Sequence, residues 1–295
     1  MAKVKTFKTI FPAVSVPLND DYSINEPEFR AYLRWIKSFY GKGIEGLVCN
    51  GHTGEITGLT RAERKRVVEI CSEECGDVMT IISGVNCENT AESIAMAKEA
   101  KEAGADGILL MPPHMWLRFG MNPNAPFEYV KDVAEGADID IIIHLYPATS
   151  KAFYPVETLI KMCKEIDHVK CIKMGTRVTS IYEHDVRLLR QECPDISLIT
   201  CHDETLCVSW FPGMDGALIG FAGCVPELIC PAWDVFKNPD KHTLKEAQDW
   251  SNRIYHISQA IYGGGQPSGE AHARLKEALK QRGIFTSALM RKPVL

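Results

Sequence analysis

Short apolar runs alternate with longer amphipathic stretches along most of the chain. The runs are apolar at odd and even positions alike and rich in Ile and Val, which is typical of strands that are buried on both faces. This pattern predicts strands at Ile10–Val16, Gly46–Cys49, Met79–Val85, Gly107–Met111, Ile139–Leu145, Val169–Met174, Ile196–Cys201 and Ala217–Phe221.

The stretches between these runs have helical periodicity. Pro27–Lys42, for example, repeats its apolar residues at helical spacing. Thr90–Ala103 opens with Thr90, a candidate helix cap, and is followed by Gly104–Gly107, a Gly-Ala-Asp-Gly segment that ends a helix and begins a strand. Strands and helices in regular alternation predict an α/β fold, a (β/α)8 TIM barrel.

The chain continues well beyond the last predicted strand. Pro226–Phe236 is expected to complete the eighth helix. Two further helices, Asp240–Tyr262 and Gly269–Arg282, are separated by a run of glycines and Pro267. No linker long enough to isolate them is visible. We therefore expect a barrel at residues 1–238 and a C-terminal helical extension at residues 239–295.

Composition and charge narrow the classes of function. The formal net charge is −5 and no basic tract is present, so nucleic acid is not an expected partner. No run approaches the ~18 apolar residues of a membrane span, and the first residues lack the apolar core of a signal peptide. The eleven cysteines form no Cys-x-x-Cys pair and lie mostly in apolar patterns. We therefore expect a protein of the reducing cytoplasm.

One lysine stands at the end of a predicted strand, where the active site of such a barrel lies. Lys173 closes an apolar run, and an unpaired ammonium there would be costly to desolvate. Desolvation lowers the pKa of a lysine and frees its amine to attack a carbonyl group. The alternative is a structural lysine that reaches the rim or pairs with a carboxylate such as Asp203.

A turn and a set of histidines also follow predicted strands. Gly51–Glu55 can aim backbone N–H groups and the Thr53 hydroxyl at a carboxylate, although it also fits an ordinary loop. The histidines at strand ends are His52, His114, His144 and His202. Three histidines could bind a metal. Neither a His-x-His nor a paired carboxylate spacing supports such a site, and we expect no metal or other cofactor.

Several segments occur in an order that is specific as a set. They are Phe11–Ala13 with Val16–Leu18, Gly51–Glu55, Ser83–Asn86, Thr90–Glu92, Gly104–Gly107, Ile172–Lys173, Gly213–Gly216 and Arg291–Val294. In these segments the chain resembles the dihydrodipicolinate synthase / N-acetylneuraminate lyase family over nearly its whole length. The resemblance implies a (β/α)8 barrel with a C-terminal helical extension. It also implies an imine between a lysine of the sixth strand and pyruvate or another 2-oxo acid.

The resemblance assigns roles to particular residues. Lys173 would form the imine, and Thr53 with the backbone at His52 would hold the substrate carboxylate. Asp203 and Glu204 fall where sugar-acid lyases of the family bind hydroxyl groups, and a helix cap is the alternative for this pair. The expected substrate-binding residues also include the pair that follows the eighth strand, Gly220 and Phe221.

Two departures from the family concern the fifth strand. The family places a proton-shuttling tyrosine three residues before the proline that matches Pro147, and this chain has His144 there. We expect His144 and Tyr146, two residues later, to be catalytic, with a histidine relay titrating near pH ~6.5 before environmental shifts. Thr149 replaces the arginine of dihydrodipicolinate synthases, which argues against the lysine-biosynthetic activity.

These observations predict a lyase that acts on a pyruvate-type 2-oxo acid through a lysine Schiff base, with aldol or retro-aldol cleavage. The same imine could serve a dehydratase, a deaminase or a hydratase-aldolase, and Pro113–Trp116 is similar to a segment of hydratase-aldolases. A barrel that binds a ligand without turnover is the alternative from another class. The resemblance also implies a homodimer or homotetramer, with Met115 and Trp116 at a subunit contact.

Overall fold

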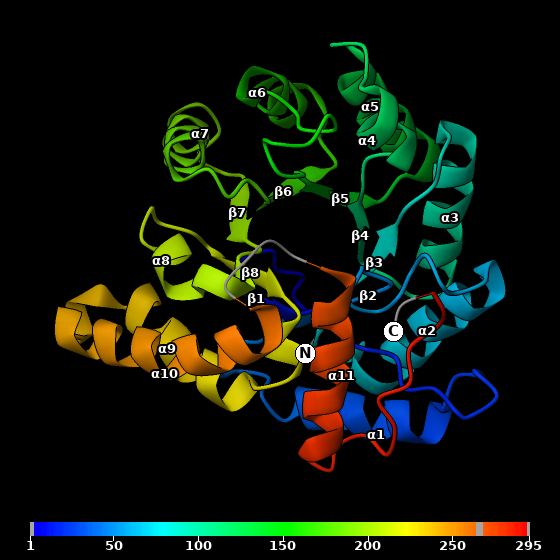
Figure 1. The fold of residues 1–295 in the computed structure, drawn as a ribbon. Helices are drawn as coiled ribbons and strands as arrows, with labels where there is room; N and C mark the ends of the chain where they lie inside the picture. The colour runs from blue at the N-terminus through cyan, green and yellow to red at the C-terminus, as the bar shows by residue number, and fades with distance from the viewer. Residues whose placement is uncertain (1–2, 264–267, 294–295) are drawn as a thin grey trace.

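Eight parallel strands stand at the centre of the computed structural model, which describes residues 3–263 and 268–293 (Figure 1). The strands are β1 (Ile10–Pro12), β2 (Gly46–Cys49), β3 (Thr80–Val85), β4 (Gly107–Leu110), β5 (Asp140–His144), β6 (Val169–Met174), β7 (Ser197–Thr200) and β8 (Gly216–Ile219). They pair in sequence order from β2 to β8, and β8 pairs with β1. All eight predicted strand positions are therefore confirmed.

The ring of strands closes between β1 and β2. The Ala13 N–H donates to Ile219 O of β8 at 2.9 Å, and the next N–H, that of Val14, donates to Val48 O of β2 at 2.9 Å. The chain thus changes its partner strand within two residues. This switch ends β1 at Pro12, earlier than the run Ile10–Val16 predicts.

Helices surround the ring (Figure 1). They are α1 (Glu26–Lys37), α2 (Arg61–Cys75), α3 (Thr90–Glu102), α4 (His114–Phe119), α5 (Ala125–Ala137), α6 (Val156–Glu165), α7 (Thr179–Glu192), α8 (Leu206–Trp210), α9 (Pro226–Lys237), α10 (Leu244–Tyr262) and α11 (Gly269–Gln281). Short 3-10 turns η1 (Asp203–Thr205), η2 (Phe221–Gly223) and η3 (Pro239–Lys241) join some of them. The predicted (β/α)8 barrel with a C-terminal helical part is confirmed. No helix of the described residues is long and apolar enough to cross a membrane.

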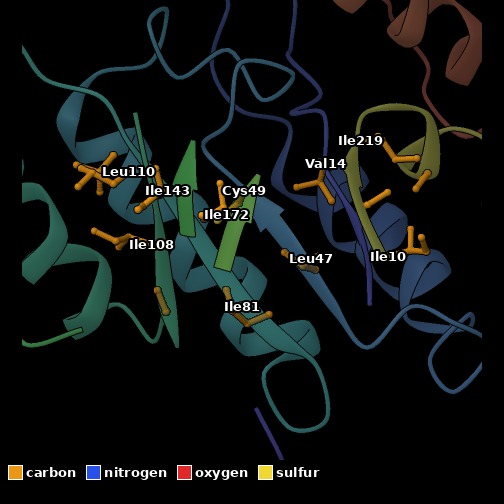
Figure 2. Close-up of a cluster of buried hydrophobic side chains, with 14 of the residues drawn as sticks. Ile10, Val14, Leu47, Cys49, Ile81, Ile108, Leu110, Ile143, Ile172 and Ile219 are labelled. Atoms are coloured by element: carbon orange, nitrogen blue, oxygen red, sulfur yellow. The ribbon is translucent and has the colours of Figure 1, made fainter. Parts of the chain in front are cut away.

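Two apolar layers explain why the strands are apolar at odd and even positions alike. One set of strand residues packs toward the helices, as Figure 2 shows for Leu47, Ile81, Ile108 and Ile172. The alternate residues form a second buried cluster inside the ring, with members such as Phe11, Val48, Ile82, Leu109, Ile142, Cys171, Ile199 and Leu218. Each strand therefore buries both of its faces, as expected for a parallel barrel.

The repeated Gly-x-Asp-Gly pattern has a common structural role. Gly104 and Gly213 adopt left-handed backbone angles, with φ of 101° and 90°, just before β4 and β8. The aspartates that follow accept a backbone N–H from the preceding strand, Asp106 from Ile81 at 2.8 Å and Asp215 from Leu198 at 2.9 Å. Each segment thus ends a helical stretch and fixes the start of the next strand.

Helix bounds differ from the prediction where caps decide them. The N-cap of α3 is Asn89, whose side chain accepts the Glu92 N–H at 2.9 Å, so Thr90 is already inside the helix. Helix α10 starts at Leu244 rather than Asp240, because Thr243 and Glu246 form a reciprocal capping box. The predicted break at Gly264, Gly265 and Pro267, and the tail residue Val294, lie outside the described residues.

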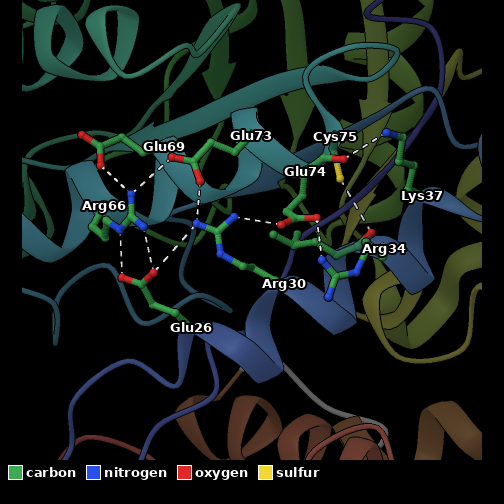
Figure 3. A network of polar contacts seen from close by, with 10 residues as sticks. Glu26, Arg30, Arg34, Lys37, Arg66, Glu69, Glu73, Glu74 and Cys75 are labelled. Atoms are coloured by element: carbon green, nitrogen blue, oxygen red, sulfur yellow. Dashed lines mark hydrogen bonds and ion pairs between the residues drawn. The ribbon is translucent and has the colours of Figure 1, made fainter.

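Outside the barrel, α1 and α2 are joined by a network of ion pairs (Figure 3). Arg30 bridges to Glu74 at 2.8 Å, and Arg66 binds Glu26 at 2.8 Å. Most of these groups are half-exposed, and such pairs contribute little individually. The network orients two helices on the outside of the barrel and takes no part in the site described next.

Candidate active site

A cavity of about 570 Å³ opens at the C-terminal ends of the strands. It receives residues from the loops after β2, β4, β5, β6, β7 and β8, and from α11 and the C-terminal tail. Eight of the nine predicted site residues line it, namely His52, Thr53, His144, Tyr146, Lys173, Asp203, Glu204 and Gly220. These eight residues come from five separate parts of the sequence, at or just after the ends of β2, β5, β6, β7 and β8.

Lys173 lies at the end of β6 and lines this cavity. Its amine has no hydrogen bond and no ion pair within residues 3–263 and 268–293. The alternative considered from the sequence, an ion pair with Asp203, is therefore not formed in the structure. Burial lowers the pKa of Lys173, while the nearby Cys201 and Asp203 partly oppose this shift. A larger fraction of the amine is therefore unprotonated near neutral pH than for a lysine in water.

His144 lies beside Lys173 on the neighbouring strand. The two residues pair in register between β5 and β6, so their side chains leave the sheet on the same face. His144 is buried, and its Nδ1 atom has no hydrogen-bond partner in the described part of the chain. Burial first, and then the charge of Lys173, hold the pKa of His144 well below its ordinary value of 6.5. The ring is therefore a neutral imidazole that retains a free acceptor or donor.

Tyr146 and His52 form a polar contact above His144. The Tyr146 hydroxyl lies 3.3 Å from His52 Nε2, and the ring centroids of Tyr146 and His144 are 4.9 Å apart. Burial lowers the pKa of His52 to about 3, so its ring is neutral. Burial raises the pKa of Tyr146, so its phenol stays protonated. Either the Tyr146 hydroxyl or His52 Nε2 donates in this contact, according to the tautomer of the imidazole.

The loop after β2 brings Thr53 to the cavity wall. Thr53 is buried, and its hydroxyl lies close to Gly220: a Cβ atom added at Gly220 would be 3.1 Å from Thr53 Oγ1 and 2.7 Å from Leu275. Glycine at 220 thus leaves room for Thr53 and for the helix that carries Leu275. The hydroxyl of Tyr262 also lies near Gly220, 3.2 Å from the same Cβ position.

Asp203 and Glu204 already bind protein groups. Asp203 Oδ1 accepts the Phe221 N–H at 2.8 Å, and burial raises the pKa of Asp203 to about 6. Glu204 Oε1 accepts from Arg177 Nε at 2.6 Å, and Arg177 also donates to Gly175 O at 2.8 Å. The hydroxyl of Tyr262 also lies beside the Asp203 carboxylate and opposes part of the rise in its pKa. Phe221 is fully buried, is not among the cavity-lining residues and contributes its backbone N–H.

Sequence reasoning missed several side chains of this cavity, including those of Arg177, Tyr262 and His272. Arg177 follows the lysine strand, and Tyr262 and His272 come from the C-terminal extension. Burial, with the charge of Lys173, lowers the pKa of His272 to about 4. His272 shares a helix face with the buried Leu275, and that periodicity was the available signal. No group of three or more His, Cys, Asp or Glu side chains in the described ranges could hold a metal ion.

Comparison with known proteins agrees with this geometry. The dihydrodipicolinate synthetase family matches residues 6–295. An uncharacterised DapA-like lyase of Pyrococcus horikoshii is 29% identical over 287 residues, 97% of this chain and 93% of that protein. The chain belongs to the dihydrodipicolinate synthetase family, whose relatives are lyases of the pyruvate-dependent aldolase class.

Solved structures share the fold. A prophage protein of Escherichia coli K12 from the dihydrodipicolinic acid synthase family, solved in complex with pyruvate, has a TM-score of 0.87 and 20% identity, covering 99% of this chain and 93% of its own. N-acetylneuraminate lyase from Fusobacterium nucleatum has a TM-score of 0.82 and 22% identity, covering 97% of this chain and 92% of its own. At these identities the likeness extends to the fold alone.

Proposed function

We propose that this chain is a class I aldolase that binds a pyruvate-type 2-oxo acid as a Schiff base on Lys173 and cleaves or forms a carbon–carbon bond next to it. One observation carries the proposal: the Lys173 amine ends a buried strand, lines the cavity and has no ion pair among the described residues. A desolvated, unpaired amine is the nucleophile that imine formation needs.

The reaction follows from the chemistry of the imine. The unprotonated Lys173 amine attacks C2 of the 2-oxo acid, and water leaves. In the cleavage direction, a base removes the C4 hydroxyl proton, the C3–C4 bond breaks, and its electron pair passes to the protonated imine to give an enamine. The enamine then takes a proton at C3, and water hydrolyses the imine to release the 2-oxo acid.

The loop after β2 supports binding of the substrate carboxylate. Thr53 offers a hydroxyl, and the backbone around His52 offers N–H groups, both on the cavity wall. These donors are neutral. The Thr149 side chain is exposed and does not line the cavity, so it does not supply the second carboxylate-binding group of dihydrodipicolinate synthases.

His144 and Tyr146 are the groups that we propose for the proton transfers. His144 is neutral and pairs in register with Lys173, so it can accept a proton close to the imine. Tyr146 is protonated and contacts His52, so it can donate one. A neutral base beside a protonated acid is the pair that retro-aldol cleavage and its reversal require.

Borohydride trapping tests the proposal. Reduction in the presence of pyruvate should add one pyruvate-derived mass to a peptide containing Lys173, and Lys173→Ala should abolish both the adduct and the activity. Lys170→Ala is the matched control, because Lys170 lies three residues earlier on β6 and is exposed. An adduct that persists in Lys173→Ala, or no adduct in the wild type, contradicts the proposal.

A hydratase-aldolase is the second candidate, because part of the cavity wall is apolar. Leu109 and Leu218 line it from the barrel, and Leu117 lines it from α4. This wall suits a leaving aldehyde with an apolar or aromatic part. Incubation with a benzylidene pyruvate tests it: release of an aromatic aldehyde supports the hydratase-aldolase, while cleavage of polyhydroxylated substrates alone excludes it.

A further inference from the structure

A buried ion pair joins the carboxylate-binding loop to the C-terminal helix. Glu55, from the loop after β2, meets Lys276 of α11, and their side chains are only 7% and 1% exposed. The same Lys276 amine donates to Leu289 O at 2.8 Å. Burial lowers the pKa of Lys276, and Glu55 opposes this shift. The catalytic scheme above uses neither charge, although both are costly to bury.

The C-terminal tail reinforces the connection. The Arg291 N–H donates to Glu55 Oε2 at 2.8 Å, so both carboxylate oxygens of Glu55 face the C-terminal part of the chain. The Arg291 guanidinium donates to Gly58 O at 3.0 Å and to Glu63 Oε2 at 2.9 Å. The loop is therefore held from its outer side by two elements more than 200 residues away in sequence.

Glu55 also controls the backbone of the loop. It is a non-glycine residue with a left-handed φ of 56°, a conformation that its surroundings must stabilise. Its N–H donates to His52 O at 3.0 Å, and its carbonyl accepts the Gly58 N–H at 2.7 Å. Thr53 lies within this turn. The direction of the His52–Thr53 peptide thus depends on where Glu55 is held.

Helix α11 reaches the cavity from the same side. His272, one turn before Lys276, lines the cavity, and Leu275 packs against Gly220 beside Thr53. One helix therefore both holds the loop and forms a wall next to it. A shift of α11 would move the Thr53 donors and the cavity wall together.

We propose that Glu55 and Lys276 are positioning residues that aim the donors of the Thr53 loop at the substrate carboxylate. The proposal rests on the Schiff-base function above. It predicts a specific defect when the pair is broken: recognition of the carboxylate is lost, while the reactivity of the Lys173 amine is kept. Misplacement of positioned groups by about 1 Å costs on the order of 100-fold in rate.

The experiment compares two carbonyl compounds that differ only in the carboxylate. Borohydride trapping at Lys173 is measured with pyruvate and with methyl pyruvate, over a range of concentrations. In the wild type, pyruvate should be trapped at much lower concentration than its ester. In Lys276→Met and in Glu55→Gln, half-saturation by pyruvate should rise by roughly 10- to 100-fold, while trapping of methyl pyruvate stays as in the wild type.

Two further variants separate positioning from general destabilisation. Each single variant leaves an unpaired buried group and should lower Tm, whereas the double variant Glu55→Gln/Lys276→Met removes both charges and should recover Tm. The double variant should nevertheless lack the wild-type preference for pyruvate over methyl pyruvate. Lys280→Met is the matched control, because Lys280 lies one turn further along α11 with a half-exposed side chain. It should trap both compounds as the wild type does.

The outcomes distinguish this inference from the proposed function. If the wild type forms the Lys173 adduct and the double variant keeps the wild-type preference for pyruvate over methyl pyruvate, the positioning role is wrong and the Schiff base stands. If trapping of pyruvate and of methyl pyruvate falls equally in the variants while Tm is unchanged, the pair acts on Lys173 rather than on the carboxylate. In that case the inference is also wrong. Absence of any adduct in the wild type refutes the Schiff base and this inference with it.

Discussion

Replacing His144 by alanine tests the proposed proton relay most directly. Loss of a positioned acid or base typically lowers turnover by ~10²–10⁴-fold. His144 is the neutral base that pairs in register with Lys173, so we expect a loss on this scale in His144→Ala. The Lys173 adduct should still form, because the amine does not bind the imidazole: within the described residues it has no hydrogen bond.

Tyr146→Phe supplies the comparison. It removes a hydroxyl that meets His52 Nε2 at 3.3 Å. A neutral hydrogen bond contributes about 0.5–1.5 kcal/mol, which converts to roughly 2- to 13-fold in rate if Tyr146 only orients its neighbours. The assay is steady-state aldehyde release for both variants, with adduct formation measured in parallel. A nearly wild-type His144→Ala together with an inactive Tyr146→Phe would refute the histidine relay.

Burial changes the pH dependence that the sequence alone suggests. A free histidine would titrate near pH ~6.5, but burial and Lys173 hold the pKa of His144 well below that value. The imidazole is then a neutral base throughout the neutral range, and its contribution is lost only as pH falls through the lowered pKa. The rate should therefore show no inflection from His144 near its ordinary pKa. If the rate of the wild type has an inflection near the ordinary histidine pKa and this inflection is absent in His144→Ala, the imidazole is solvated and the argument from burial is wrong.

Three further predictions concern the amine, the quaternary structure and metals. The rate of adduct formation should rise with pH through a lysine pKa below the ordinary 10.5, since burial favours the neutral amine; a profile centred at 10.5 would show that Lys173 is solvated. Of the predicted contact pair, Met115 is exposed (49%), whereas Trp116 packs against Tyr129 and Tyr154. Together with Phe119 (77% exposed), Met115 gives α4 an apolar surface, so we propose a homo-oligomer with a contact there. Phe119→Asp should shift sedimentation toward monomer, and an unchanged oligomer would place the contact elsewhere. Turnover should survive chelation, because the protonated imine is itself an electron sink; a loss restored by zinc would contradict this.

The sequence predicts those features that depend on local pattern. The strands are predictable because a strand with two buried faces is apolar at odd and even positions alike. In β4, for example, Ile108 packs toward the helices and Leu109 packs inside the ring. The sequence also places Lys173 at the mouth of the barrel, because this lysine ends such a strand, and it does line the cavity there. Boundaries set by one side chain are less predictable: Asn89 and Thr90 are both good caps, and only the backbone shows which one accepts the Glu92 N–H.

The other part of the site depends on contacts between distant segments. His272 and Lys276 lie on α11, whose sequence is that of an ordinary amphipathic helix. Nothing local indicates that one of its lysines is buried against Glu55, because the partner is 221 residues earlier in the chain. The same holds for Arg177, whose pairing with Glu204 joins the ends of two neighbouring strands. Such pairs require the closed barrel before they can be identified.

Apart from Asp203, whose carboxylate lies near Lys173, the charges of the cavity leave a place for an anion that the proposed substrate would supply. The described imidazoles of His52, His144 and His272 are held neutral by burial, and the Lys173 cation contributes to each of these shifts. The guanidinium of Arg177 is matched by Glu204. On the proposed chemistry, the protonated imine is then balanced by the carboxylate of the 2-oxo acid itself, bound by neutral donors at Thr53. A positively charged side chain that bound the carboxylate at that position would lower the pKa of Lys173 further. It would also disfavour the protonated imine on which cleavage depends.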